Sequence, residues 1–294
     1  MLVLEAYLSE RRRTIDEALD RCMPAEGERP SILHRAMRYS VFCGGKRLRP
    51  VLCLAAAEAV GAACDAALIP AISIEVLHTY TLIHDDLPCM DDDALRRGKP
   101  TSHIVFGEAN ALLAGDALLT LAFEWLCAVK APAPYPPSEL ARELAVAAGS
   151  RGVIGGQVED LAAEGKEPSA DLVDFIHANK TGALIRAAVR MGAIAGGADR
   201  NALEALSSYA DKIGKAFQIT DDILNATSSA EARGKPAGTD AGRGKMSAVR
   251  VYGLEKSKQQ AAALLKDALT ALAAIDGPVE ALAAIGDYVV RRTQ

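Results

Sequence analysis

Apolar residues recur along most of this chain at the three- and four-residue spacing of amphipathic helices, and alternating strand patterns are hard to find. Pro50 suits a first helical turn, and Gly44-Gly45 ends the segment before it. The proline-rich stretch from Ala131 to Pro137 predicts a connector. The pattern predicts helices, with ends placed to within about 3 residues, over Ser31–Phe42, Pro50–Val60, Ala66–Asp86, Ala109–Val129, Ser138–Ala148, Ala170–Ile194, Asn201–Leu224, Lys256–Ala274 and Val279–Arg292.

No linker or short-period repeat divides the chain, so we expect one all-α domain over residues 1–294. Composition agrees with this expectation. Half of the residues are hydrophobic, but only 4% are aromatic, a mixture that favours helices over sheets.

Charge and cysteine content exclude several classes of function. A net charge of −5 gives no support to nucleic-acid binding. No uncharged apolar run reaches membrane-spanning length, and Met1 to Ser9 runs straight into Glu10-Arg11-Arg12-Arg13, the wrong order for a secretory signal. The six cysteines show no C-x-x-C pair and no zinc-ligand spacing, which is typical of a reducing compartment. We therefore expect a cytoplasmic protein with no membrane span.

Two groups of aspartates stand at the ends of predicted helices. The first is Asp85-Asp86 followed by Asp91 to Asp93, and the second is Asp221-Asp222. Carboxylates this close repel one another, and their hard oxygens suit Mg²⁺, which shares its remaining positions with waters and substrate phosphates. A single pair is more often surface charge, but two pairs that each end a long apolar helix favour a functional site.

Geometry alone does not say which acidic residues of the first group act together. At 100° per residue Asp85 and Asp92 fall about 20° apart, whereas Asp91 falls about 120° away. Pro88 disturbs that register, because it removes a hydrogen bond and clashes with the previous turn. Which of Asp91, Asp92 and Asp93 joins Asp85 at a metal therefore stays open.

Cations gather in other segments. The segment from Gly44 to Pro50 places Lys46, Arg47 and Arg49 on a glycine-rich turn before a helix, where backbone N–H groups and guanidinium groups can bind an anion. Taken singly, this turn and the segments Arg96 to Lys99 and Lys180 to Gly182 are weak signals. Together with the acidic groups, they predict two anionic groups, one bound through metal and one bound directly.

The longest irregular stretch, from Ala226 to Ser247, directly follows the second acidic group and holds Lys235 and Lys245. A loop this long inside a compact domain is usually functional. We expect it to act as a lid over the acidic residues.

These motifs resemble those of short-chain trans-isoprenyl diphosphate synthases, and the chain is most similar to the bacterial type of farnesyl diphosphate synthase. The most specific part is the D-D-x-x-x-x-D run followed by R-R-G-K-P-T, from Asp85 to Thr101. The resemblance covers nearly the whole chain, including Gly155-Gly-Gln157, Lys180-Thr-Gly182 and Tyr288 to Arg292. It implies a homodimer and a fold of long helices around a deep central cavity, with the acidic motifs facing each other across its mouth.

The resemblance also implies the roles of single residues. Five aspartates match the metal-binding motifs, with three Mg²⁺ ions expected once substrate is bound: Asp85, Asp86, Asp91, Asp221 and Asp222. The site for isopentenyl diphosphate matches Gly45, Lys46, Arg49, His78 and Arg97. The allylic-substrate site matches Arg96, Lys180, Thr181, Gln218 and Lys235. Lys245 aligns with a loop lysine, Arg292 with a basic tail that covers the site, and Gln157 and Asp160 with an inner-helix motif.

The implied reaction joins isopentenyl diphosphate to dimethylallyl and then geranyl diphosphate, giving (2E,6E)-farnesyl diphosphate. Mg²⁺ and the basic residues make the allylic diphosphate a good leaving group, and the closed apolar cavity excludes water. Oxygens from Thr181, Gln218 and the Lys180 carbonyl hold the carbocation until the second substrate attacks. These three residues and Arg96 are the expected catalytic residues.

The expected product length depends on Tyr80 and its neighbour Thr81. Tyr80 precedes Asp85 by five residues, which places it about 7.5 Å deeper along the helix, where a phenol would block a longer tail. The resemblance links a large aromatic there, with the Leu87-Pro88 form of the motif, to a C15 product. The alternative is that Tyr80 is only a core or dimer-interface residue.

One departure concerns Asn225, which stands where the family usually has Asp. It removes one negative charge, so we expect activity with weaker Mg²⁺ affinity. An Asn225→Asp variant with unchanged Mg²⁺ dependence would contradict this.

Several rivals stay open. A geranylgeranyl diphosphate synthase is opposed by Tyr80, and a geranyl diphosphate synthase is a further alternative. A class I terpene cyclase needs no second cation site, and its N-x-x-x-S-x-x-x-E motif fails because position 233 is Arg. A non-catalytic subunit of the same fold tends to lose the first acidic motif, which this chain keeps.

Overall fold

Helices form most of the chain, as the apolar periodicity predicts. The computed structural model describes residues 2–227 and 245–292. Its helices are α1 Leu4–Cys22, α2 Ser31–Val41, α3 Leu48–Ala59, η1 Cys64–Ala67, α4 Leu68–Asp85, α5 Ser102–Phe106, α6 Glu108–Cys127, α7 Glu139–Ala148, α8 Val153–Ala162, α9 Ala170–Ile176, η2 His177–Gly182, α10 Ala183–Ala195, α11 Arg200–Thr227, α14 Ala248–Tyr252, α15 Leu254–Leu272 and α16 Glu280–Arg291. Two short antiparallel strands, β1 Leu95–Arg96 and β2 Lys99–Pro100, follow the first acidic group.

Each helix that the pattern predicts is present, with its ends within about 3 residues of the prediction. The segment predicted as Ala170–Ile194 is interrupted by η2, a π-helical turn. The pattern missed α1 and α8, besides the short α5 and α14. In α1 a run of charges hides a narrow apolar stripe that buries Ile15 and Leu19, and α8 begins with two glycines in its first turn, which lower helix propensity.

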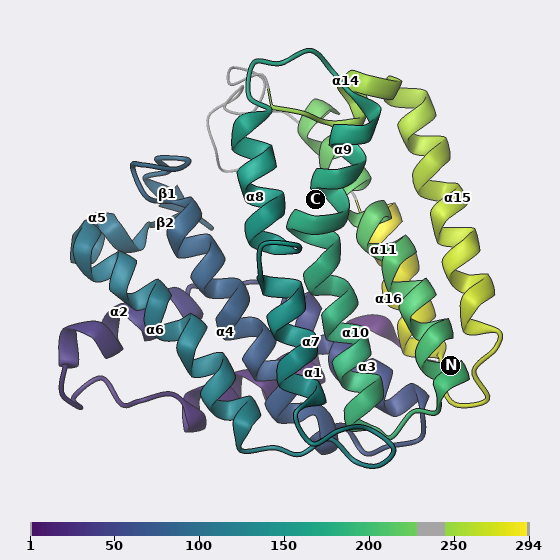
Figure 1. Cartoon of the computed structure of the whole chain (residues 1–294), viewed down its shortest axis with the longest axis horizontal. Helices are drawn as coiled ribbons and strands as arrows, with labels where there is room; N and C mark the ends of the chain where they lie inside the picture. The colour runs from purple at the N-terminus through teal and green to yellow at the C-terminus, as the bar shows by residue number, and fades with distance from the viewer. Residues whose placement is uncertain (1, 228–244, 293–294) are drawn as a thin grey trace.

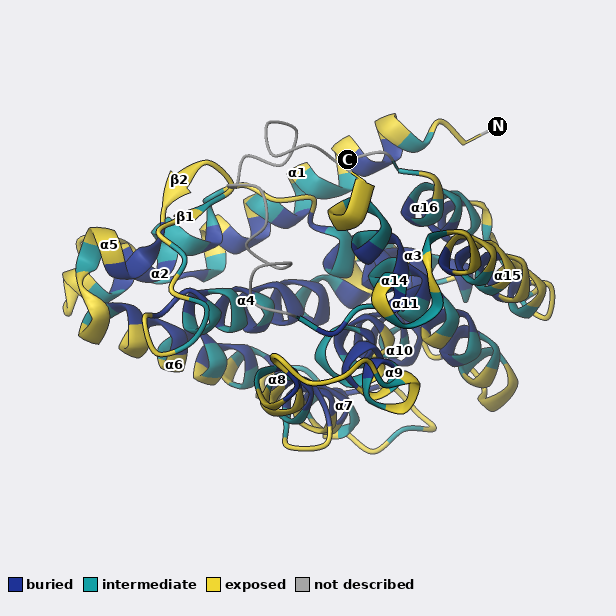
Figure 2. Cartoon of the chain, turned by 90° about the horizontal axis from the view of Figure 1, so that it is seen from above, coloured by how far each residue is buried: buried dark blue, intermediate teal, exposed yellow. Residues whose placement is uncertain are grey.

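The core lies where α3, α4 and α10 pack together, and these helices bury residues around most of their circumference. Gly192 on α10 lets the two backbones approach closely, because a Cβ there would overlap the carbonyl of Cys53 on α3. Figure 1 shows α4, α8, α10, α11 and α15 standing side by side as a bundle. From above, the buried residues concentrate along α3, α4 and α10, whereas the outer faces of α5 and α15 are exposed (Figure 2). This arrangement confirms the all-α prediction.

Two helices in the described part of the chain are long and apolar enough to cross a membrane by length and composition alone, Cys64–Asp85 and Glu108–Cys127. They pack against each other, and most of the first is buried inside the bundle. A buried core helix has the same composition as a membrane span, so this observation is weak evidence for one.

Candidate active site

A cavity of about 720 Å³ opens between α4, α8, η2, α10 and α11. It is lined by polar residues toward the ends of α4 and α11 and by apolar residues of α6, α8 and α10. The sequence-predicted site residues that line it are Arg49, His78, Tyr80, Thr81, Asp85, Arg96, Arg97, Lys180, Thr181, Gln218 and Asp221. Residues from both acidic groups and from three cationic segments therefore meet at one cavity.

The first acidic group lies where α4 ends. Pro88 cannot continue the helix, and the chain turns back so that the Asp91 amide donates to the Asp85 carbonyl at 2.8 Å. Burial raises the pKa of Asp85 to about 6, with Lys180 opposing the rise and Asp91 adding to it. Asp86 lies outside the set that lines the main cavity. Its buried carboxylate accepts hydrogen bonds from Arg96 Nε at 2.7 Å and Nη2 at 2.6 Å.

The second acidic group lies on α11, at the opposite side of the cavity mouth. Burial raises the pKa of Asp221 to about 6, while Arg292 opposes the rise and Asp222 adds to it. Arg292, just beyond α16, donates to Asp221 at 2.5 Å and stacks over the Phe217 ring at 4.0 Å. The C-terminal cation is thus held over the second acidic group.

A side pocket of about 150 Å³ adjoins this group and is lined by Asp222 and Asn225 among others. Asp222 is buried, lies 3.1 Å from His177 Nε2 and accepts a 2.7 Å hydrogen bond from the Ala248 amide. Asp222 therefore connects α11 to η2 and to the start of α14. Lys245, just before α14, pairs with Asp91 of the first group at 3.1 Å.

The donor set fits divalent cations shared with a ligand rather than a metal cage made by the protein. Within the described residues no three His, Cys, Asp or Glu side chains are grouped closely enough to hold a metal ion by themselves. Mg²⁺ is usually held by one or two carboxylates, with phosphate oxygens and waters at the other positions. Asp85 and Asp221, both with a raised pKa and both lining the cavity, are carboxylates whose negative charge such an ion would stabilise.

A cluster of cations lies deeper on the α3 side. Arg49 Nη1 lies 3.1 Å from His78 Nε2, and the Arg97 guanidinium donates to the Gly44 carbonyl and packs on Gly45, where a Cβ would overlap it. Burial, reinforced by Arg49 and Arg97, holds the pKa of His78 well below its ordinary value. Burial likewise lowers the pKa of Arg49, whose Nε is buried with no partner among the described residues. A bound anion would reduce the repulsion between the Arg49 and Arg97 guanidinium groups and would accept a hydrogen bond from Arg49 Nε.

Arg47, another cation of the glycine-rich turn, points elsewhere. Arg47 adopts φ 50°, is buried, and pairs with Glu75 at 2.7 Å and with Asp16 at 2.9 Å. Glu75 is also buried, on α4 one turn before His78. Arg47 therefore ties the glycine-rich turn to α4 instead of facing the cavity.

The π-helical turn η2 carries Lys180 and Thr181 into the cavity wall. Thr181 Oγ1 donates to Gln218 Oε1 at 2.7 Å, and Lys180 Nζ donates to Asp160 at 2.6 Å. π-Helical turns occur frequently at functional sites because they change the direction of side chains locally. Here the turn groups two side-chain oxygens from η2 and α11 above the apolar part of the cavity.

The other predicted site residues lie at the rim or beyond the described part. Lys46 Nζ lies 5.8 Å from the Tyr288 ring, and Gly45 lies under Arg97. Lys235 falls outside the described residues, as does most of the stretch predicted as a lid.

Sequence reasoning gave no role to several residues that the structure places at the site. His84 and Phe217 line the main cavity and His177 pairs with Asp222. Gln157 also lines the cavity, and both its side-chain polar atoms are buried without a partner among the described residues. His84 directly precedes Asp85 and His177 lies one turn before Lys180, so nearness to a motif was the available signal.

Comparisons with known proteins agree with this geometry. Geranylgeranyl pyrophosphate synthase 7, chloroplastic, of Arabidopsis thaliana is 45% identical over 98% of this chain and 83% of its own length. A geranylgeranyl diphosphate synthase of Cyanophora paradoxa is 41% identical over 98% of this chain and 96% of its own. The solved structure of an FPP/GFPP synthase from Zymomonas mobilis matches with a TM-score of 0.83 at 36% identity, covering 98% of each chain.

A geranylgeranyl pyrophosphate synthetase from Pyrococcus horikoshii has a similar structure, with a TM-score of 0.90 at 30% identity over 98% of each chain. A family model described as polyprenyl synthetase matches residues 30–284, most of the chain. The chain therefore belongs to the polyprenyl synthetase family.

Proposed function

We propose that this protein is a divalent-metal-dependent trans-prenyltransferase that makes farnesyl diphosphate from isopentenyl diphosphate and allylic diphosphates. The observation that carries the proposal is the layout of one cavity. Asp85 and Asp221 line its mouth from two different helices, the cations Arg49 and Arg97 line it as well, and Tyr80 lines it five residues before Asp85. Such a cavity has room for two diphosphates at its mouth and one apolar tail below.

The chain's own residues have separable tasks in this reaction. Arg49 and Arg97 hold the diphosphate of isopentenyl diphosphate. His78 on α4, which is neutral because its pKa is lowered, adds a hydrogen bond without adding charge. Lys180 at the cavity wall neutralises the leaving diphosphate of the allylic substrate. Thr181 and Gln218, linked at 2.7 Å, direct oxygen dipoles toward the positive charge that develops on the allylic carbons.

Bound at Asp85, Asp91 and Asp221, Mg²⁺ would supply electrostatic withdrawal of charge from the allylic diphosphate. Three ions are expected from the family resemblance. Asp86 and Asp222 are buried and paired with Arg96 and His177, whereas the other three aspartates are partly exposed. We therefore propose that Asp86 and Asp222 hold the mouth in shape and orient the residues that touch metal.

Geranylgeranyl diphosphate is the second candidate product. Relatives at 41% to 45% identity are named geranylgeranyl synthases, which favours it. Tyr80 favours the shorter product, because it is buried in the cavity wall five residues before Asp85, about 7.5 Å deeper along α4. The names of the relatives therefore favour the longer product and Tyr80 the shorter one, and the product assay decides between them.

We further propose that the protein is a homodimer. Neighbouring helices α5 and α6 expose the large apolar side chains Ile104, Val105, Leu112 and Leu113. A contiguous apolar surface of this kind is typical of a protein interface.

The test is a product assay. Purified protein is incubated with Mg²⁺, isopentenyl diphosphate and either dimethylallyl or geranyl diphosphate, and the dephosphorylated alcohols are separated by gas chromatography. Farnesol as the main product supports the proposal, geranylgeraniol supports the second candidate, and geraniol supports a shorter synthase. If neither primer is elongated, a non-catalytic subunit becomes the better interpretation.

A further inference from the structure

His84 lies on the cavity wall between α4 and α6, next to the residue expected to limit product length. It follows Tyr80 by four residues, so both side chains leave α4 on the same face and both line the cavity. Their rings meet edge to face, with centroids 5.3 Å apart at an interplanar angle of 89°. This is a preferred geometry for two aromatic rings, so the imidazole supports the phenol laterally.

The imidazole is itself fixed by α6. Its Nε2 lies 3.0 Å from the Leu112 carbonyl, which can only accept, so Nε2 carries the proton. The Asp116 carboxylate lies 3.8 Å from the same nitrogen. The Tyr80 ring on α4 and the Leu112 carbonyl and Asp116 carboxylate on α6 together set the position of the imidazole.

Gly115 leaves the space that the ring occupies. A Cβ at this position of α6 would overlap the imidazole at Nε2 and Cδ2. The φ of Gly115 is an ordinary helical one, so what this glycine provides is room for the ring and not backbone freedom. Any side chain at position 115 must displace the imidazole, which packs against the Tyr80 ring and lines the cavity with it.

We infer that His84, seated against Gly115, is a second product-length residue that holds the Tyr80 ring across the apolar part of the cavity. This inference rests on the proposed function. It assigns a specificity role to a residue beside the acidic motif and to a glycine on another helix. The two substitutions that follow from it have opposite expected directions.

The test compares product distributions of His84→Ala, Gly115→Ala and the double variant. His84→Ala frees Tyr80 and widens the cavity, so the ratio of geranylgeranyl to farnesyl product should rise about tenfold, since one methylene in an apolar pocket changes discrimination by about 10- to 200-fold. Gly115→Ala pushes the imidazole toward the cavity, so the share of geranyl product should rise. In the double variant the new methyl group occupies the space of the lost ring, and the distribution should return toward wild type.

Controls separate this role from damage to the neighbouring acidic residue. Gly27→Ala, where a Cβ meets nothing within 4 Å, should leave the product distribution unchanged. His84→Phe keeps a ring against Tyr80 and should lengthen the product less than His84→Ala. Calorimetry of geranyl and geranylgeranyl diphosphate binding reads the same preference without turnover, and light scattering checks that each variant keeps the wild-type mass.

The outcomes distinguish the inference from the proposed function. If Tyr80→Ala lengthens the product while His84→Ala and Gly115→Ala keep the wild-type distribution and the wild-type ratio of affinities, the inference is wrong and the proposed function stands. If the single variants shift in the same direction, the inference is also wrong. If wild type elongates neither primer, both fall together.

Discussion

Glu75 is a buried carboxylate beneath the cation cluster, and its charge stabilises more than its direct partner. It pairs with Arg47 at 2.7 Å and also attracts Arg49 and Arg97, which repel each other. Arg47 holds the glycine-rich turn from below, and Arg49 and Arg97 face the cavity. The negative charge of Glu75 therefore contributes both to folding and to the shape of the anion site.

We predict that Glu75→Gln lowers the free energy of unfolding by about 3 kcal/mol, because it removes the buried charge partner of the Arg47 guanidinium and leaves only Asp16, which is exposed. It should also raise KM for isopentenyl diphosphate more than KM for dimethylallyl diphosphate. Urea unfolding and steady-state kinetics measure the two effects. The matched control is Glu17→Gln, which breaks an exposed pair with Arg13 and should change stability by less than about 1 kcal/mol. Equal changes in both KM values would mean that Glu75 acts on folding alone.

Asp85 makes the folding stability of the metal-free protein fall as the pH rises, because its pKa is raised in the folded state. Its pKa is raised from an ordinary 3.8 to about 6 in the folded state, so the folded protein holds its proton where the unfolded chain has lost it. Ionising it therefore costs stability, and this cost builds up as the pH rises from about 4 to 6 and is then constant. We predict that metal-free Asp85→Asn has a higher Tm than wild type at pH 7 and that this advantage shrinks toward pH 4. Scanning calorimetry in a chelator would show it, and an advantage that is equal at both pH values would contradict it.

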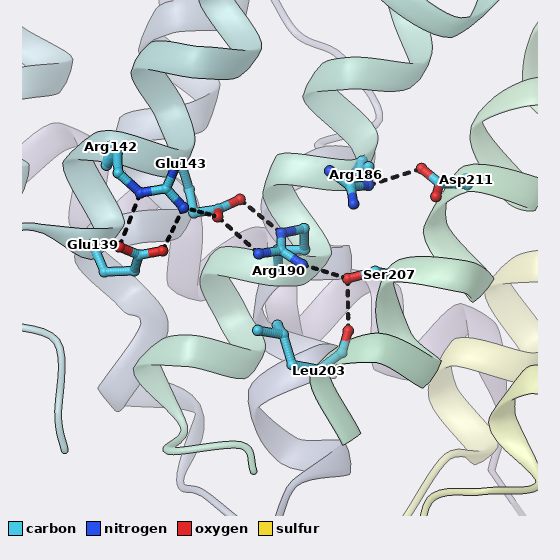
Figure 3. A network of polar contacts seen from close by, with 8 residues as sticks. All are labelled: Glu139, Arg142, Glu143, Arg186, Arg190, Leu203, Ser207 and Asp211. Carbon is cyan, nitrogen blue, oxygen red and sulfur yellow. Dashed lines mark hydrogen bonds and ion pairs between the residues drawn. The ribbon is translucent and has the colours of Figure 1, made fainter. Parts of the chain in front are cut away.

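At the scale of helices, a polar network joins α7, α10 and α11 (Figure 3). Arg190 on α10 donates to Glu143 on α7 at 2.7 and 2.8 Å and to Ser207 on α11 at 2.7 Å. Ser207 in turn donates to the Leu203 carbonyl at 2.6 Å. Because Glu143 and Ser207 are buried, this guanidinium fixes the relative positions of three helices.

We predict that Arg190→Met lowers the free energy of unfolding by about 3 kcal/mol, because it leaves the buried Glu143 carboxylate with only the exposed Arg142 as an ionic partner. Adding Glu143→Leu should restore much of the loss, because two apolar side chains can replace a buried pair. Asp211→Asn, which breaks the exposed pair with Arg186 in the same view, should change stability by less than about 1 kcal/mol. Chemical unfolding of wild type, the two single variants Arg190→Met and Glu143→Leu, their double variant and the Asp211→Asn control measures this, and additive losses would contradict coupling through the pair.

For the whole molecule, the exposed apolar surface on α5 and α6 leads to a prediction about assembly. We expect wild type to have twice the mass of one chain in light scattering, and Leu113→Glu to shift it toward a single chain by burying a charge in the interface. Leu269→Glu places the same charge on an exposed leucine of α15 and should keep the mass unchanged. A single-chain mass for wild type would rule out the proposed homodimer.

The sequence predicted the fold well because helical periodicity is local and strong, and it missed α1 where charged residues mask a narrow apolar stripe. The family resemblance implied that Asp85 and Asp221 belong to one site, and both line the main cavity. It could not show that Asp86 is clamped by Arg96 or that Arg47 turns toward Glu75, because these orientations depend on residues distant in the sequence. Single histidines such as His84 and His177 carry no pattern, and only the packing of α4 on α6 and of η2 on α11 shows what they contact.

The π-helical turn at His177–Gly182 has a consequence for insertions and deletions. Such a turn holds one residue more than the regular helix on either side. Deleting Ala178 would let α9 and α10 run together as one continuous α-helix, and because the turn accommodates the extra residue locally, the two flanking helices would keep their register with each other. The backbone would become more regular, while the grouping of Lys180 and Thr181 with Gln218 and Asp160 would be lost. We expect the shortened chain to have a Tm at least as high as that of wild type and to have no activity. The extra residue therefore makes the helix less regular but groups the side chains that the site needs.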